Sequence, residues 1–160
     1  MSIQTLLSMG ALIILSLASL RFNSVFLETS TTEVENKVYM TAFSLADDLI
    51  EEIKQKAFDA NTINFPTNNP AGLTPAGSLG PGWWEIYPNY NDIDDYNYFK
   101  KTVSAPHAEN YTVYSRVYYV TATNPNQIST TQTFYKKVVV TVSSKYFRKP
   151  VSLNFIFTLK

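Results

Sequence analysis

The chain opens with an apolar run that contains no charged residue, MSIQTLLSMGALIILSLASL. A helix over residues 1–20 would be about 30 Å long at ~1.5 Å per residue, close to the thickness of the hydrocarbon core of a bilayer. Arg21 follows directly and ends the uncharged run. This pattern predicts a helix that can span a membrane.

Three interpretations of this segment are open. A cleavable signal peptide has Lys or Arg ahead of its apolar run, and Ser2, Ile3 and Gln4 provide neither. A single-pass anchor would end at Arg21, at the membrane interface. An assembly helix would lie in the membrane first and in a bundle of protein helices afterwards, and small residues such as Gly10 favour such close packing.

The helical pattern continues beyond the apolar run to about Ala57. In its second half one apolar stripe recurs at steps of three or four residues, and we expect that stripe to pack on a sheet. The stripe consists of Val34, Val38, Ala42, Leu45, Leu49, Ile53 and Ala57. The opposite side is mostly charged, and Glu52 and Lys56 have the spacing of a stabilising ion pair. We interpret this side as a solvated helix face rather than an active site.

Residues 59–82 are rich in proline and glycine, which end the helix and predict a surface loop. The next stretch, GWWEIYPNYNDIDDYNYFKK, surrounds the acidic residues Asp92, Asp94 and Asp95 with aromatic ones. Asp92 and Asp94 are weak candidates for Ca²⁺ ligands, but the EF-hand pattern fails. We therefore predict no metal and no cofactor, and a turn in which Asp and Asn side chains bind nearby backbone. Trp83 and Trp84 are expected to close a small core rather than to stack on a ligand.

The remaining chain reads as strands. Tyr111–Thr123 and Gln132–Phe147 are rich in β-branched and aromatic residues, and the NPNQ turn between them predicts a hairpin. Val151–Leu159 alternates apolar and polar residues, so one of its faces should meet the helix, with Phe155 and Phe157 as anchors. With a shorter strand near Trp83–Tyr87, the prediction is an α+β fold: about four antiparallel strands packed on one long helix.

Composition narrows the possible functions. The 160 residues suffice for a helix over 1–58 and one head domain over 59–160. Thirteen basic and thirteen acidic residues balance, which disfavours nucleic acid as a partner. Cysteine is absent, and the single histidine, His107, has no recognisable catalytic motif around it. We expect a protein that is not an enzyme.

An uncharged N-terminal run that continues into an amphipathic helix, a loop and an antiparallel sheet resembles the type IV pilin and pseudopilin superfamily. The resemblance implies removal of a leader and methylation of the new N-terminal residue, here Met1. It also implies a glutamate at the fifth position, where this chain has Thr5 beside Gln4, and often a cysteine pair near the C-terminus, which this chain lacks. A neutral side chain at position 5 should register neighbouring subunits more weakly.

The predicted function is a structural subunit of an extracellular type IV pilus-like filament that is inserted in the membrane before assembly. By resemblance, its partners are identical subunits, the inner membrane, a prepilin peptidase and the pilus assembly machinery. The residues predicted to form the filament core are Met1, Gln4, Thr5, Leu6, Leu7, Gly10, Leu12, Ile13, Leu15, Leu20, Phe22 and Phe26. The alternatives are a minor pseudopilin of a type II secretion system and a monomeric, membrane-anchored binding domain.

Overall fold

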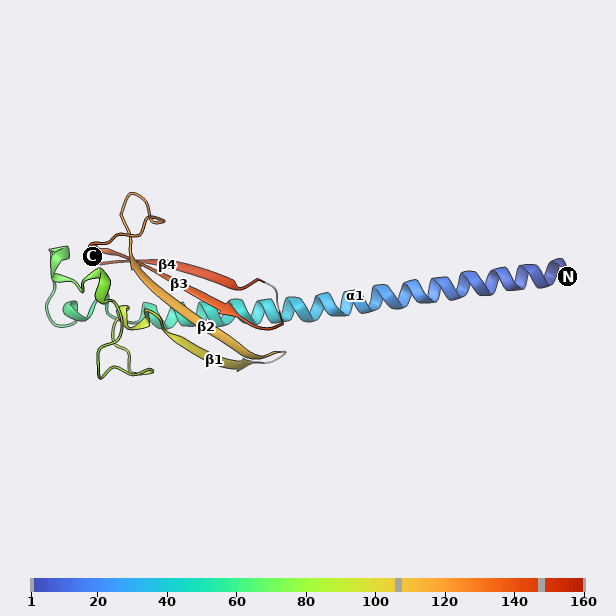
Figure 1. Cartoon of the computed structure of the whole chain (residues 1–160), viewed down its shortest axis with the longest axis horizontal. Helices are drawn as coiled ribbons and strands as arrows, with labels where there is room; N and C mark the ends of the chain where they lie inside the picture. Colours follow the sequence, from blue (N-terminus) through green and yellow to red (C-terminus); the bar gives the residue numbers. More distant parts are fainter. Residues whose placement is uncertain (1, 106–107, 147–148, 160) are drawn as a thin grey trace. The chain divides into compact units, whose positions relative to one another are not determined.

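The computed structural model describes residues 2–105, 108–146 and 149–159. One long helix, α1 (Ile3–Lys54), is followed by loops with short 3₁₀ turns and then by four strands. The strands are β1 (Lys100–Ala105), β2 (Ala108–Tyr119), β3 (Tyr135–Ser143) and β4 (Val151–Thr158) (Figure 1). The predicted α+β fold, with a long N-terminal helix and a four-stranded antiparallel sheet, is confirmed.

The sheet is a simple meander in the order β1-β2-β3-β4, with every neighbouring pair antiparallel. Val117 of β2 lies opposite Val138 of β3, and Val140 of β3 lies opposite Leu153 of β4. On β3 the even-numbered residues from Lys136 to Val142 are buried and the residues between them are half-buried. This period of two gives the sheet one fully covered face.

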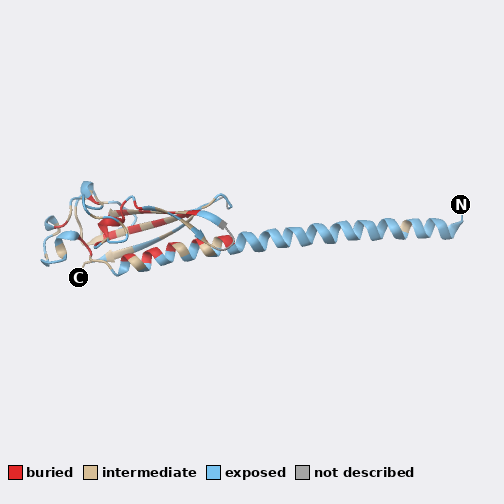
Figure 2. Cartoon of the chain, turned by 90° about the horizontal axis from the view of Figure 1, so that it is seen from below, coloured by how far each residue is buried: buried red, intermediate tan, exposed pale blue. Residues whose placement is uncertain are grey.

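The chain forms two compact units, residues 1–37 and residues 38–160. The hydrophobic core belongs to the second unit, where Val38, Ala42, Leu49 and Ile53 of α1 are buried with valines of the sheet. Figure 2 shows this change along α1, from exposed turns in the first unit to buried positions in the second. Steps of three and four residues keep these side chains on one face of the helix.

Two details of the predicted stripe differ from the structure. Val34 is 52% exposed, so the packed stripe begins at Val38. Ala46 and Ile50 are buried as well, because a helix that lies along a sheet buries a face wider than a single row of residues. The helix ends at Lys54 rather than near Ala57, whose backbone instead pairs with the segment around Asp92.

The strand predictions are right for β2, β3 and β4 and wrong at the start of the sheet. Trp83–Tyr87 forms turns, and the first strand is β1, at Lys100–Ala105. Strand β1 is an edge strand that begins with two lysines, and every second residue of it is exposed. A search for hydrophobic residues therefore does not detect it. The hairpin connection is also longer than the predicted turn, since β2 ends at Tyr119 and β3 begins at Tyr135.

The last strand meets the helix as predicted. Phe157 packs against the core, and the ammonium of Lys54 on α1 lies 4.3 Å from the ring centroid of Phe155. Phe155 itself is 38% exposed, because β4 is an edge strand and covers only the margin of the core. Phe157 is thus the better anchored of the two rings.

Candidate functional site

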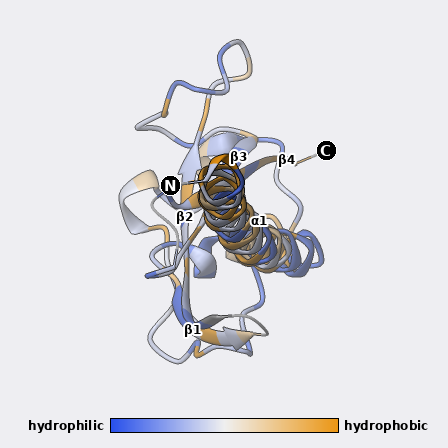
Figure 3. Cartoon of the chain, turned by 90° about the vertical axis from the view of Figure 1, so that its right-hand side faces the viewer, coloured by the Kyte–Doolittle hydropathy of each residue, from blue (hydrophilic) through white to orange (hydrophobic). Residues whose placement is uncertain are grey.

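The first candidate site is the apolar surface of α1 within residues 2–37. The large apolar residues predicted for the filament core are between 57% and 76% exposed. They are Leu6, Leu7, Leu12, Ile13, Leu15, Leu20, Phe22 and Phe26. The N-terminal turns of α1 show the hydrophobic colouring in Figure 3. By length and composition this helix could cross a membrane, a test that an N-terminal signal segment would also pass.

The structure also shows the surroundings of the polar and small residues predicted for the same surface. The Thr5 hydroxyl donates to the backbone carbonyl of Ser2 at 2.7 Å, and Gln4 is exposed. Gly10 has open space where a Cβ would lie, so nothing within the described chain requires glycine there. Met1 lies outside the described residues. The roles of these residues in assembly stay predictions.

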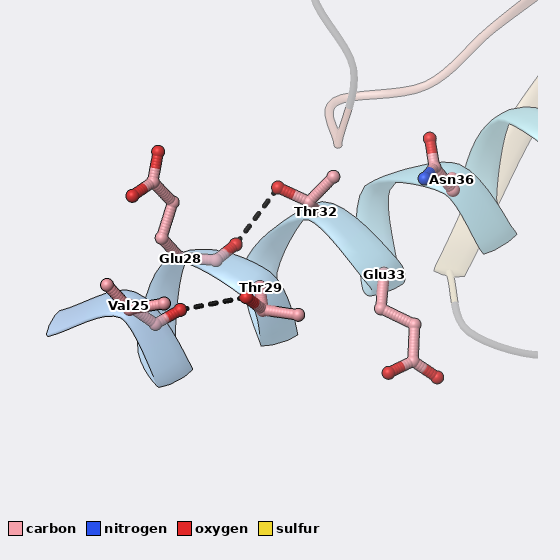
Figure 4. Close-up of a pocket in the computed structure, with 6 residues that line it drawn as sticks. All are labelled: Val25, Glu28, Thr29, Thr32, Glu33 and Asn36. Carbon is pink, nitrogen blue, oxygen red and sulfur yellow. Dashed lines mark hydrogen bonds between the residues drawn. The ribbon is translucent and has the colours of Figure 1, made fainter. Parts of the chain in front are cut away.

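A polar segment follows the apolar turns. The hydroxyls of Thr29 and Thr32 donate to the backbone carbonyls of Val25 and Glu28, each at 2.9 Å (Figure 4). The helix itself thus satisfies these hydroxyls, and α1 continues through these poor helix formers without a break. Val25, Glu28, Thr29, Thr32, Glu33 and Asn36 line a hollow here. Because one exposed helix supplies them all, the hollow encloses no binding site.

The charged side of α1 in the second unit does not form the predicted Glu52–Lys56 pair. One oxygen of Glu52 accepts a hydrogen bond from the Tyr96 hydroxyl at 2.7 Å, and Lys56 donates to the backbone carbonyl of Tyr90 at 2.8 Å. Lys56 lies beyond the end of the helix at Lys54, so the helical spacing on which the pair depends is lost.

The acidic stretch forms the predicted turn. Asp92 Oδ1 accepts from the backbone N–H groups of Asp94 and Asp95 at 2.6 and 3.3 Å. Asp95 Oδ2 accepts from the backbone N–H of Asn91 at 2.9 Å. The side chains thus hold a short 3₁₀ helix, Asp94–Tyr96, in place. Within the described residues no group of three or more His, Cys, Asp or Glu side chains is arranged to hold a metal ion.

The second candidate site is a buried cluster that the sequence alone did not reveal. Lys136 of β3 is 0% exposed, and its ammonium donates to Asp59 Oδ2 at 2.7 Å and to Asp94 Oδ1 at 2.5 Å. Its third hydrogen bond goes to the backbone carbonyl of Phe58 at 2.7 Å. Asp59 and Asp94 are buried as well, so one amine and two carboxyl groups meet away from water. We call these three residues the Lys136 cluster.

The two carboxyl groups have different surroundings. Asp59 accepts from the backbone N–H groups of Thr74 and Asn61 and from the Thr74 hydroxyl, at 3.0 to 3.2 Å. Asp94 Oδ1 accepts from Lys136, whereas Asp94 Oδ2 is buried with no hydrogen-bond partner among the described residues. The charged form is therefore well supported at Asp59 and poorly supported at Asp94.

The pKa values follow these surroundings. Burial acts to raise the pKa of Asp59, but the hydrogen bond and charge of Lys136 and the Thr74 and Asn61 amides outweigh it and lower that pKa. Burial raises the pKa of Asp94 to about 6, although Lys136 acts in the opposite direction. Burial also raises the pKa values of Asp92 and Asp95 to about 6. At mildly acidic pH, protonated and ionised carboxyl groups can thus coexist in this part of the head.

Aromatic rings enclose the amine of the cluster. The ring centroids of Phe58 and Tyr119 lie 4.5 and 5.2 Å from Lys136 Nζ. The Tyr119 hydroxyl lies 3.1 Å from Asp59 Oδ2 and 2.8 Å from the carbonyl of Thr74. One signal in the sequence could have revealed Lys136: it occupies the same alternating row as Val138, Val140 and Val142, where a charged residue is unexpected.

The two tryptophans do not close a core. Trp83 is 97% exposed and Trp84 is 93% exposed, in turns of the loop that precedes the acidic stretch. The prediction for them is wrong, because the aromatic core nearby is formed by Tyr87, Tyr90, Tyr96 and Phe99 instead. His107 lies outside the described residues.

Comparison with known proteins adds no further constraint. No family model, curated protein or solved structure matches this chain.

Proposed function

We propose that this chain is a structural subunit of a type IV pilus-like filament, assembled through α1. The observation that carries the proposal is the length of its uncovered apolar surface. A bilayer core of about 30 Å is filled by about 20 helical residues. Beyond Arg21, however, Phe22, Val25, Phe26 and Leu27 are still 58–76% exposed.

A single-pass anchor would leave this second group of apolar side chains in water, where burial would gain about 25 cal/mol per Å². Identical helices packed side by side would cover both groups at once. The uncharged run over residues 1–20 and the small residues along it suit such close packing. A contact that repeats from subunit to subunit without closing produces a fibre.

The proposal is tested on the cells that produce the protein. We expect electron microscopy of sheared material to show thin fibres, and mass spectrometry to identify this chain as their main component. Leu12→Asp combined with Leu15→Asp should abolish the fibres, since each acidic residue at the centre of an apolar helix costs roughly 2.5–3.5 kcal/mol on insertion scales.

Phe65→Asp is the matched control, because Phe65 is a 78% exposed apolar residue of the head and its replacement should leave fibres intact. Fibres that persist in the Leu12, Leu15 double variant would contradict the proposal.

A membrane-anchored binding domain is the second candidate, and a specific observation favours it. Trp83 and Trp84 are adjacent and almost fully exposed, and tryptophan is enriched at surfaces that contact a partner. This candidate, like a minor pseudopilin of a type II secretion system, predicts a membrane-bound protein of low copy number without fibres. Electron microscopy of the sheared material therefore separates both from the filament subunit.

A further inference from the structure

We propose that the Lys136 cluster forms a covalent crosslink, an amide bond between Lys136 Nζ and the side-chain carboxyl carbon of Asp94. The proposal concerns the head alone and does not depend on the filament. It starts from an amine and a carboxyl oxygen held 2.5 Å apart in a site from which water is excluded.

Proximity is the first argument. Holding two reacting groups in a fixed geometry can raise their effective concentration to ~10⁵–10⁸ M in well-oriented cases. Three hydrogen bonds, to Phe58, Asp59 and Asp94, hold the amine in place. The turn made by Asp92 and the backbone N–H groups of Asp94 and Asp95 fixes the backbone that carries the Asp94 side chain, and the bond from Lys136 orients its carboxyl group. Both reacting side chains are thereby fixed.

The two acids of the Lys136 cluster differ in how well each supports a negative charge. An ionised carboxylate is a poor electrophile, and Asp59 is kept ionised by its amide, hydroxyl and ammonium donors. Asp94 Oδ2 is buried and has no hydrogen-bond partner in the part of the chain that the structure describes, and the pKa of Asp94 is raised, so its neutral form is the more accessible one. The arrangement assigns Asp94 as the electrophile and Asp59 as the base.

The reaction is a condensation and needs no oxidant or cofactor. A proton passes from the Lys136 ammonium to Asp94, which leaves a neutral amine and a neutral carboxyl group. The nitrogen lone pair attacks the Asp94 carboxyl carbon, and the excess proton on nitrogen moves to Asp59 Oδ2. Asp59 then returns that proton to the departing hydroxyl, so that the C–O bond breaks, water is released and Asp59 is again ionised.

The surroundings favour the product. The amide is neutral, so it relieves the cost of burying a charged amine and carboxyl group. Phe58 and Tyr119 flank the site, and the exclusion of water protects the new bond from hydrolysis. The crosslink would tie β3 to the segment that precedes β1, across 42 residues of sequence, in a chain that has no cysteine for a disulfide.

Mass spectrometry of the full-length protein tests the proposal. Trypsin should release residues 57–100 joined to residues 117–137 as one branched peptide, one water lighter than the sum of the two, with no cleavage after Lys136. Fragmentation should place the branch at Asp94. The linked peptide is the decisive measurement, because N-terminal processing would change the intact mass as well.

Three variants sharpen the test. Lys136→Arg keeps the positive charge but removes the amine nucleophile, so the linked peptide should be lost. Asp59→Asn keeps a hydrogen-bond acceptor but removes the base, so the linked fraction should fall at least tenfold. Lys137→Arg is the matched control, because Lys137 donates to Asn126 outside the cluster and its replacement should leave the branch in place.

Unlinked peptides in wild-type protein, with free Lys136 cleaved by trypsin, would overturn the proposal, even if the variants failed to fold. A branch at Asp59 instead of Asp94 would overturn the assignment of electrophile and base. A linked peptide of undiminished yield in Asp59→Asn would refute the role of Asp59.

Discussion

At the residue scale, Lys136 organises the head. Its ammonium joins β3 to Asp59, just beyond α1, and to Asp94, in the turn before β1. Removing one member of a buried ion pair typically costs about 3–5 kcal/mol, because it leaves an uncompensated charge. More buried carboxyl groups than amines lie in this region, so the stability of the head should depend on how many of these carboxyl groups are protonated.

The first prediction at this scale concerns pH. The pKa of Asp92 is raised from 3.8 to about 6, chiefly by burial, a cause that does not depend on whether Asp94 is charged. A raised folded-state pKa contributes stability that is fully present below the unfolded pKa and is lost as pH rises through the folded pKa. The head should therefore lose stability between about pH 4 and pH 7, and Asp95 should act in the same direction.

Asp92→Asn should remove part of this loss, because an amide keeps the acceptor for the Asp94 and Asp95 N–H groups without ionising. At pH 7.5 we expect the variant to be more stable by on the order of 2 kcal/mol, at ~1.4 kcal/mol per pH unit of pKa difference. Thermal unfolding of the full chain in mild detergent, followed by circular dichroism at several pH values, measures this. Asp47→Asn, on the exposed side of α1, is the control. Equal pH profiles for wild type and Asp92→Asn would contradict the prediction.

At the element scale, α1 combines two different surfaces in one continuous helix. Its residues from Val38 to Ile53 have a packed face and a polar face, whereas its earlier apolar residues are exposed. Propensity does not distinguish these parts, since the threonines around residue 30 bind back to the helix instead of ending it. The two parts of α1 differ in whether other residues of the same chain cover their apolar side chains.

A prediction at this scale separates a filament subunit from a simple anchor. Phe22→Asp with Phe26→Asp changes only residues beyond Arg21, so residues 1–20 should still insert in the membrane. If neighbouring helices cover Phe22 and Phe26, the yield of sheared fibres should fall at least tenfold, because two carboxylates would be buried in an apolar contact. Membrane fractionation and electron microscopy provide the two readouts. A normal fibre yield would mean that contacts between neighbouring helices do not extend beyond Arg21.

At the scale of the whole molecule, the chain divides into a unit without a core and a unit with one. Among the described residues, the buried ones of the hydrophobic core lie between Val38 and Val142, and partly buried residues of β4 such as Leu153 and Phe157 pack against them. The sheet, the aromatic cluster around Tyr96 and the Lys136 cluster belong to the same unit. We infer that this unit carries its own folding free energy.

The corresponding prediction is a truncation. A chain that begins at Thr29 should be soluble without detergent and monomeric by size-exclusion chromatography, since the exposed apolar residues up to Leu27 are gone. Its cooperative unfolding should occur within a few degrees of that of the full chain, because no core residue is removed. Loss of cooperative unfolding would show that the first unit contributes to folding of the second.

Features that depend on a local pattern could be predicted from the sequence alone. The uncharged run, the amphipathic half of α1, the strands β2, β3 and β4 and the acidic turn each follow from the spacing of neighbouring residues. The helical period of 3.6 residues and the strand period of 2 are visible in a few consecutive residues, so they can be recognised before the fold is known. The edge strand β1 was not predicted, because its lysines and its exposed positions weaken the alternation of apolar and polar residues.

Contacts between residues that are distant in the sequence depend on the folded arrangement of the chain. Lys136 contacts Asp94 and Asp59 across 42 and 77 residues, and these contacts exist because docking of β3 brings its buried row against the end of α1 and the acidic turn. The same holds for the exposed tryptophans, since the nearby aromatic cluster is formed by Tyr87, Tyr90 and Phe99 without them. Burial is a property of the assembled core, and no local period encodes it.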